Sequence, residues 1–177
     1  KLKKNANLIL ASNVFAHSDK LKEMAGCMFK LLNKNGTIVI EVQYLLNTLK
    51  DLTFDNIYHE HYNYWSLTSL INFFNQYDAK IYRVEKINTH GGSIRIYLRK
   101  GKKIKIENSV KEIIKEAEEF GIKKYQTYQE FSKKVYKIRD NIRKNILFNP
   151  TPQIIWDKTQ ERFHGQMKFE DEIDEHS

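Results

Sequence analysis

The sequence predicts an α/β fold built on a mixed β-sheet, and three observations carry this prediction. Two short apolar segments, residues 7–11 and 37–42, flank an amphipathic segment at the spacing of a βαβ unit, which implies parallel strands. Two alternating segments, residues 80–87 and 93–99, are joined by a turn with two glycines, which predicts an antiparallel hairpin at the sheet edge. Two charged segments with apolar positions at helical spacing follow this hairpin.

The N-terminal elements form the βαβ unit. Residues 7–11 are apolar, so we expect a buried parallel strand that ends before a loop beginning at Ser12. Ser18 or Asp19 is suited to cap the next helix, because its side-chain oxygen can accept from the first free N–H groups. An asparagine- and glycine-containing stretch ends this helix, and a second buried strand follows over residues 37–42. The apolar face of the helix comprises Leu21, Met24, Ala25, Met28, Phe29 and Leu32.

The remaining elements differ in how clearly the sequence marks them. Residues 43–65 are aromatic and polar without a regular pattern, so no element is predicted there. Ser66 caps a helix whose apolar positions continue to Phe74. The hairpin strands come next, and amphipathic helices are then expected over residues 109–120 and about 125–147.

Composition argues against a nucleic-acid-binding or membrane-spanning protein. The net charge is +8, but the cations are 24 lysines and 6 arginines, and arginine is the residue that contacts phosphate and guanine with two donors. The lysines are scattered, so we expect solvated side chains. No run of 18 apolar residues and no signal peptide is present, which predicts a cytoplasmic protein. Cys27 is the single cysteine and excludes a disulfide framework within the chain; we expect it to be buried.

A shift in composition marks a boundary near residue 149. Residues 1–148 carry a net charge of +12 and residues 149–177 carry −4, and both prolines of the chain lie at the junction. We expect residues 149–177 to form a poorly ordered acidic tail. We divide the rest into a sheet-bearing part, residues 1–101, and a helical part, residues 102–148.

The segment Tyr58-His59-Glu60-His61 is the strongest candidate for a catalytic site. An imidazole titrates near neutral pH, and a neighbouring carboxylate can orient it, so such a cluster can move protons. Ligands of open α/β sheets bind at the carboxyl ends of the strands, which places residues 12–17 and 42–44 at the mouth of the site. The cluster follows the second of these strands, so we expect His17 and His61 to be neighbours in space.

Less specific interpretations stay open beside this one. Histidines in an aromatic loop are often only hydrogen-bonded structural side chains, and this is our interpretation of His59. A zinc site at His59 and His61 has a feasible spacing, but the HExxH helical arrangement is absent, so we predict no metal. The sequence His90-Gly91-Gly92 indicates either a close approach of the backbone to a ligand or a plain hairpin turn.

Three separated motifs resemble the sugar-nucleotide C-methyltransferase family: residues 13–17 (NVFAH), 57–61 (IYHEH) and 90–95 (HGGSIR). The resemblance covers about residues 5–147. It implies a Rossmann-like methyltransferase sheet, of which this chain would hold strands four to seven, followed by the first helices of a C-terminal domain. The resemblance also implies that the chain is related to proteins with three parts: an N-terminal zinc module, a methyltransferase core and a domain that contacts the nucleotide sugar.

The resemblance also implies a reaction and roles for the motif residues. A carbon of a nucleotide-linked keto-deoxysugar would be methylated, with S-adenosylmethionine as donor. His61 occupies the position that the family uses for the base. Glu60 would orient or polarise a neighbouring group, for example a sugar hydroxyl or an imidazole. Tyr58 and His17 would hydrogen-bond the ketone or enolate oxygen. The implied cofactor contacts fall on Ala11 and Asn13, and the implied substrate contacts on His90, Gly91 and Gly92.

The sequence departs from the family pattern where the cofactor should bind. It has no GxG turn, it begins at what should be strand four, and the four-cysteine zinc module is absent. Most cofactor contacts, and the zinc, would therefore belong to an N-terminal half. We expect a fragment that binds S-adenosylmethionine weakly or not at all, with a partner or the missing half covering an exposed sheet edge. The alternative is a non-catalytic remnant or interaction module.

Overall fold

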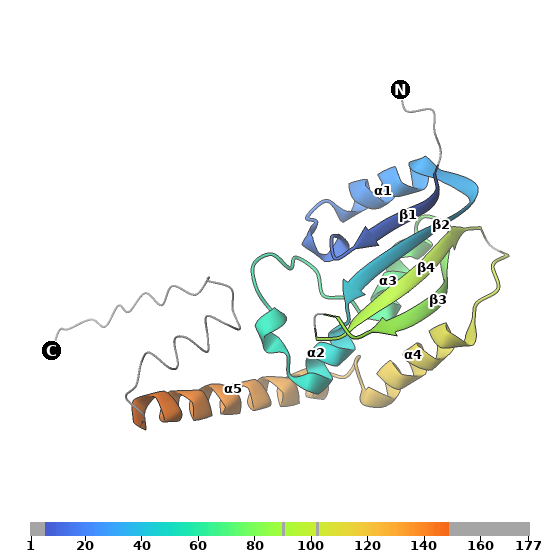
Figure 1. Cartoon of the computed structure of the whole chain (residues 1–177). Helices are drawn as coiled ribbons and strands as arrows, with labels where there is room; N and C mark the ends of the chain where they lie inside the picture. The colour runs from blue at the N-terminus through green and yellow to red at the C-terminus, as the bar shows by residue number, and fades with distance from the viewer. Residues whose placement is uncertain (1–5, 90, 102, 149–177) are drawn as a thin grey trace. The chain divides into compact units, whose positions relative to one another are not determined.

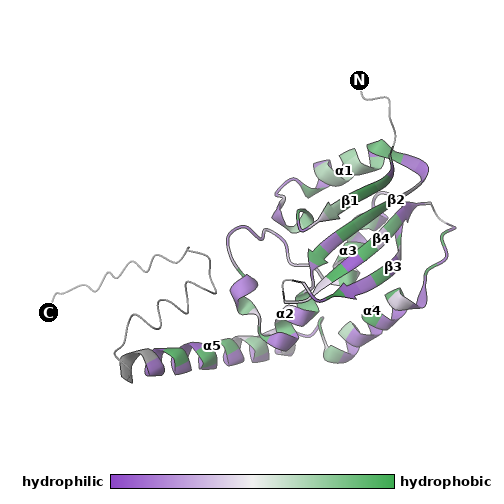
Figure 2. Cartoon of the chain, viewed as in Figure 1, coloured by the Kyte–Doolittle hydropathy of each residue, from purple (hydrophilic) through white to green (hydrophobic). Residues whose placement is uncertain are grey.

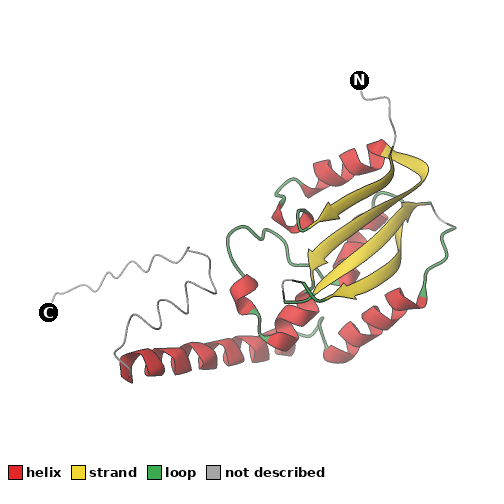
Figure 3. Ribbon diagram, viewed as in Figure 1, coloured by secondary structure: helices red, strands yellow, loops and turns green. Residues whose placement is uncertain are grey.

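The computed structural model describes residues 6–89, 91–101 and 103–148, and it confirms the predicted α/β fold with a mixed sheet (Figures 1 and 3). In chain order the elements are β1 (Ala6–Ser12), η1 (Phe15–His17), α1 (Leu21–Leu31), β2 (Leu32–Gln43), α2 (Leu45–Asp51), η2 (Phe54–Asn56), α3 (Leu67–Asn75), β3 (Ala79–Ile87), β4 (Ser93–Lys100), α4 (Asn108–Phe120) and α5 (Tyr125–Phe148).

The sheet has four strands in the order β1-β2-β4-β3. β1 pairs with β2 in parallel, whereas β4 runs antiparallel to both β2 and β3. The predicted parallel unit and the predicted hairpin at the sheet edge are therefore both confirmed. Figure 1 shows the hairpin lying beside β2, with α3 behind the sheet.

One face of the sheet carries the core. Successive side chains of a strand point to opposite faces, and on this face they are isoleucine, leucine and valine. α1 packs against β2 and α3 packs against β3, and Phe29 of α1 contacts both Phe74 and Tyr77 near α3. Figure 2 shows the same concentration of hydrophobic residues on the strands. The fully buried strand residues include Ile38, Ile40, Ile94, Ile96 and Leu98. We call this the covered face.

We call the opposite face of the sheet the open face, and its exposure shows that one prediction was wrong. β1 was expected to be buried, yet Leu8 and Leu10 are 62% and 66% exposed. β1 lies at the sheet edge, and only Ala11 of this strand is fully buried, on the covered face. Leu10 pairs with Val39, which pairs with Tyr97, so these side chains share the open face.

The structure also corrects the predicted cap of α1 and the predicted start of β2. The expected cap at Ser18 or Asp19 was wrong, because the N-cap residue is Lys20 and it makes no side-chain cap. Ser18 instead accepts a hydrogen bond from the Lys20 N–H at 3.1 Å. β2 begins at Leu32, five residues earlier than predicted, because its first residues extend along β1 and Leu32 pairs with Ala6.

Cys27 was expected to be buried, and this was wrong as well. It is exposed, because the covered side of α1 is made by Ala25, Met28 and Phe29. One helix, α2, was missed in the irregular segment. Its helical spacing is set by Leu46 and Leu49, which are buried.

The other predicted helices are confirmed. Ser66 caps α3 and forms a reciprocal capping box with Ser69. α4 packs against β3, and the compact unit around the sheet extends to residue 134. Of the second unit, residues 135–177, the structure describes the last part of α5, and the predicted acidic tail lies outside the described residues. None of the helices described is both long and apolar enough to cross a bilayer.

Candidate active site

A small cavity of about 100 Å³ opens at the carboxyl ends of β1 and β2, where the sequence places the mouth of the site. Its walls come from the end of β1, from η1, from the end of β2 and from the loop after α2. The residues that line it are Asn13, Ala16, His17, Val42, Gln43, Asn56, Tyr58 and His61.

His17 lies in η1, shortly after the end of β1. Asn13 has a φ of 54°, in the left-handed region that asparagine tolerates better than most residues, and its N–H donates to the Glu41 carbonyl at 3.0 Å. The chain then turns into η1. Phe15 is fully buried and stacks on Phe74 with ring centroids 5.6 Å apart, which fixes the turn to the core. His17, two residues later, is thereby held at the cavity.

Two hydrogen bonds bring the loop after α2 to this turn. The Tyr62 N–H donates to the Ala16 carbonyl at 3.1 Å, and the Asn63 side-chain amide donates to the Ser18 carbonyl at 3.2 Å. As a result the His17 and His61 rings lie 4.8 Å apart between centroids. The prediction that these two residues are neighbours in space is confirmed.

The hydrogen bonds of His61 decide which of its ring nitrogens carries the proton. Nδ1 lies 2.8 Å from the Asn56 carbonyl oxygen, which can only accept, so Nδ1 carries the proton and donates. Nε2 is therefore the basic nitrogen of the neutral ring. The Tyr58 hydroxyl lies 3.3 Å from it. Burial raises the pKa of Tyr58, and the charge of Glu60 raises it further, so the hydroxyl stays protonated and donates to Nε2.

The same reasoning applies to His17. Its Nδ1 lies 3.0 Å from the Glu60 carbonyl oxygen and therefore donates to it. Glu60 thus contacts the site through its backbone, while its side chain is exposed. Residues 58–61 form a turn, closed by the His61 N–H and the Tyr58 carbonyl at 3.1 Å. His59 is exposed in this turn and meets the Tyr58 ring edge-on at 6.2 Å.

The other predicted site residues that the structure describes do not line the cavity. Ala11 is buried in the core. Gly91 lies behind the wall against Asn56, where an added Cβ would come within 3.3 Å of the amide nitrogen. His90 lies outside the described residues. Among the residues described, no group of three histidine, cysteine or acidic side chains could hold a metal ion.

Asn56 is the residue of the cavity that the sequence did not indicate. Its contribution is a carbonyl oxygen, which every residue type has, so its identity carries no signal. Tyr44 shows the opposite error. It was placed at the mouth, but it is fully buried, and burial raises the pKa of its hydroxyl.

Comparison with known proteins identifies the family. Residues 1–84 match a methyltransferase domain family, and residues 88–149 match the C-methyltransferase C-terminal domain family. The C-methyltransferase NovU of Streptomyces niveus is 32% identical over 142 residues, which are 80% of this chain. Together, these matches support the assignment of the chain to a C-methyltransferase family. The first match ends at residue 84, within β3, and the second begins at residue 88, just after β3, so the predicted boundary at residue 101 stays a prediction.

The chain spans about a third of NovU, 34% of its length. A solved structure shows a partial likeness: magnesium protoporphyrin IX methyltransferase (ChlM) from Synechocystis PCC 6803 with bound SAH. The two are 12% identical, with a TM-score of 0.43 over 57% of this chain and 48% of that one.

Proposed function

We propose that the chain carries the proton-abstracting part of a C-methyltransferase that acts on a nucleotide-linked keto-deoxysugar, with His61 as general base. The observation that carries the proposal is the 2.8 Å hydrogen bond between His61 Nδ1 and the Asn56 carbonyl, because it leaves Nε2 as the base beside the cavity. The 32% identity to NovU supports methyl transfer to carbon.

Methylation of a carbon next to a ketone requires a carbanion. Nε2 of His61 would accept the proton of the C–H bond alpha to the ketone, and the electron pair of that bond would move to the ketone oxygen to form an enolate. Tyr58 would exchange its long 3.3 Å contact with Nε2 for a hydrogen bond to the enolate oxygen. Donors placed in advance where charge develops lower such barriers most.

His17 supports this step from the other side of the cavity. Because Nδ1–H already donates to the Glu60 carbonyl, Nε2 of His17 can donate to the enolate only when the ring carries both protons. Glu60 would orient His17 through this carbonyl. His59 has no part in the proposal, since its side chain is exposed in the turn.

S-adenosylmethionine would supply the methyl group when bound, but the cavity beside His61 is too small to enclose it. This cavity measures about 100 Å³, whereas ligand pockets are typically ~300–1,000 Å³. Among the described residues that line it, none is a carboxylate that could hold a ribose. We therefore propose that polypeptide outside residues 1–177 makes most of the donor contacts, in keeping with the 34% of NovU that the chain spans.

A second candidate function is that of an interaction module without catalysis. β1 pairs with β2 along one side, and no other strand among the residues described pairs with its second side. Leu8 and Leu10 expose apolar surface beside this free edge. In a methyltransferase the rest of the enzyme would cover the edge and these leucines. In an interaction module another polypeptide would do so.

Solvent deuterium exchange separates the two functions, because enolate formation needs no methyl donor. The 177-residue chain is mixed with a nucleotide-linked keto-deoxysugar in deuterium oxide, and incorporation alpha to the ketone is followed by NMR. We expect exchange, slowed by about 10²–10⁴-fold in His61→Ala. The matched control His59→Ala removes a neighbouring exposed imidazole and should leave the rate unchanged. Equal rates in the unmodified chain and His61→Ala would contradict the proposal.

A further inference from the structure

An ion pair with a buried carboxylate lies on the open face, close to the candidate site, and has no role in the proton transfer itself. Glu41 of β2 pairs in register with Arg95 of β4, and its side chain is only 7% exposed. Arg95 donates to Glu41 Oε2 through Nε at 3.1 Å and Nη2 at 2.8 Å. A buried carboxylate is costly unless it is paired and hydrogen-bonded, and here one oxygen receives two charged donors.

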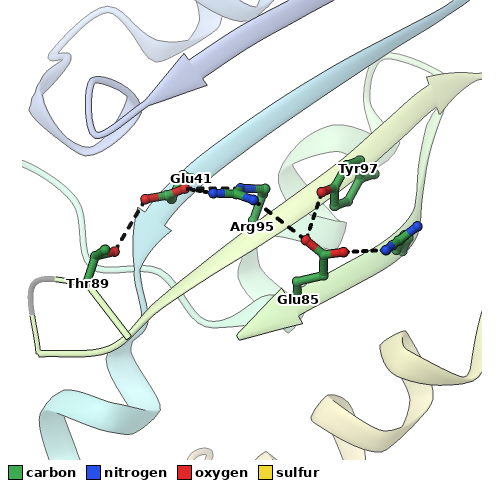
Figure 4. Close-up of polar contacts among 6 residues, drawn as sticks. Glu41, Glu85, Thr89, Arg95 and Tyr97 are labelled. Atoms are coloured by element: carbon green, nitrogen blue, oxygen red, sulfur yellow. Dashed lines mark hydrogen bonds and ion pairs between the residues drawn. The ribbon is translucent and has the colours of Figure 1, made fainter. Parts of the chain in front are cut away.

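The other oxygen of Glu41 holds the turn that joins β3 to β4. The Thr89 hydroxyl donates to Glu41 Oε1 at 3.3 Å (Figure 4). Among the described residues, this hydrogen bond links the Glu41 side chain to a residue outside the strands. It reaches the segment whose sequence indicated either a close approach to a ligand or a plain hairpin turn. Arg95 lies between Glu41 and Glu85, so its charge is balanced by carboxylates and is not available to bind an anionic ligand.

The turn is fixed at its far end as well. Gly92 N–H donates to the Thr89 carbonyl at 2.9 Å, and the Gly92 carbonyl accepts from the Tyr44 N–H at 3.1 Å. Gly92 has a φ of 104°, and a Cβ there would lie 2.7 Å from Asn47 Cγ, so no side chain fits. These contacts hold Thr89 and Gly92 to each other and to the residues at the end of β2.

The tip of the turn lies against the residue that orients His61. A Cβ added to Gly91 would meet Asn56 Nδ2 at 3.3 Å and Thr53 Cγ2 at 3.4 Å, so Gly91 packs directly on the segment that ends in Asn56. The Asn56 carbonyl receives the proton of His61 Nδ1. Described contacts thus link Glu41 to Thr89 and Thr89 to Gly92, and the adjacent Gly91 packs on Asn56, which binds His61.

We propose that the Glu41–Arg95 pair positions the base of the reaction: it holds Thr89 and, through the turn, keeps the Asn56 carbonyl in place to select the Nδ1–H tautomer of His61. Glu41, Arg95 and Thr89 are positioning residues, because they touch neither the cavity nor the reacting atoms. This inference rests on the proposed function for its catalytic meaning. The tautomer of His61 is nevertheless a property of the chain itself.

The test needs neither sugar nor methyl donor. NMR of the 177-residue chain with ¹⁵N-labelled histidine at about pH 8, where histidine is mainly neutral, distinguishes a protonated from an unprotonated ring nitrogen. We expect His61 of the unmodified chain to be protonated at Nδ1. In Thr89→Val the ratio of the Nδ1–H to the Nε2–H tautomer should fall by about fivefold, which corresponds to the usual net effect of weakening one hydrogen bond.

Two variants separate positioning from general loosening of the sheet. Thr89→Ser keeps the hydroxyl and should restore the ratio. Thr37→Val removes a hydroxyl that accepts a hydrogen bond from Arg99 on the same face and should leave the ratio unchanged. If Thr89→Val does not fold, Arg95→Lys carries the test with a shift in the same direction. An unchanged ratio in Thr89→Val, or an equal change in Thr37→Val, overturns the inference.

The two proposals fail separately. Absence of deuterium exchange with a shifted tautomer ratio in Thr89→Val would contradict the proposed reaction and leave the positioning intact. Exchange that depends on His61, together with a ratio that Thr89→Val does not change, would support the reaction and overturn the positioning.

Discussion

The two faces of the same four-stranded sheet differ in what they contain and in what they do. On the covered face, Ile38, Ile40 and Ile96 are fully buried under helices. On the open face, the neighbouring positions of the same strands carry Glu41, Arg95 and Tyr97, with exposed leucines on β1. Alternate residues of the same strands therefore have different roles. Those on the covered face form the core, and those on the open face are linked to the candidate site or face the polypeptide that we propose covers the sheet.

The sharpest test of this division compares two aliphatic side chains. Ile96→Ala empties a fully buried position on the covered face and should cost ~2–5 kcal/mol of unfolding free energy, because it creates a cavity. Leu10→Ala, on the open face, should change it by less than ~0.5 kcal/mol. Urea unfolding followed by circular dichroism measures both. Equal losses would show that the open face is packed in solution.

A smaller but clear effect is expected from the ion pair. Arg95→Met leaves the Glu41 carboxylate buried without its two charged donors, and should cost ~1–3 kcal/mol in the same unfolding experiment. The double variant Glu41→Leu/Arg95→Met leaves no buried charge and should recover most of the loss. A double variant that is less stable than Arg95→Met would contradict this account.

Acid should lower the free energy of unfolding by protonating two carboxylates. Hydrogen bonding by Tyr97, aided by Arg83 and Arg95, lowers the pKa of Glu85, and Lys50 and Lys86 lower that of Glu116. A carboxylate with a lowered pKa in the folded state stabilises the fold above its unfolded pKa, and this contribution is lost as the pH falls through the folded pKa. Unfolding free energy should therefore decline below about pH 4.5.

Urea titrations between about pH 6 and pH 3 check this decline. Glu85→Gln and Glu116→Gln should each flatten it. Asp19→Asn, at an exposed acid for which no ion pair is found in the described part of the chain, should leave the slope unchanged. A slope that neither glutamine variant alters would exclude these two groups as its source.

The least change in stability is expected at the free edge. Leu8→Lys/Leu10→Lys should alter unfolding free energy by less than about 0.5 kcal/mol per site, because both side chains are exposed. The charges should, however, suppress edge-to-edge association of the chain, which sedimentation velocity measures directly. If the unmodified chain and the double variant associate to the same extent, the edge and its leucines do not drive association.

The sequence predicted the elements with strong periodicity and failed where tertiary contacts decide. The strands over residues 80–87 and 93–99 were clear because their apolar residues alternate and a Gly-Gly turn joins them. The start of β2 was missed because it depends on pairing between Leu32 and Ala6, which no local pattern records. α2 has only seven residues, too few for its two buried leucines to establish a helical period.

The sequence predicted the side chains of the candidate site but not the backbone carbonyls that bind them. His17 and His61 could be placed together because both follow parallel strands of one unit. The carbonyls of Asn56 and Glu60 that select their tautomers have no sequence signal. Glu41 did carry one: a carboxylate within the apolar run Ile38–Val42 must find a partner, although the sequence could not identify Arg95.

The exposed thiol of Cys27 makes the unaltered chain ready for single-site labelling. It is the only cysteine in the 177 residues, so a maleimide dye attaches at one place without removal or addition of any residue. α1 is anchored to the core through Phe29, and the dye would therefore sit on the helix that covers one face. A polypeptide that docks on the other face would slow the tumbling of the labelled chain, and fluorescence anisotropy would report its arrival in real time.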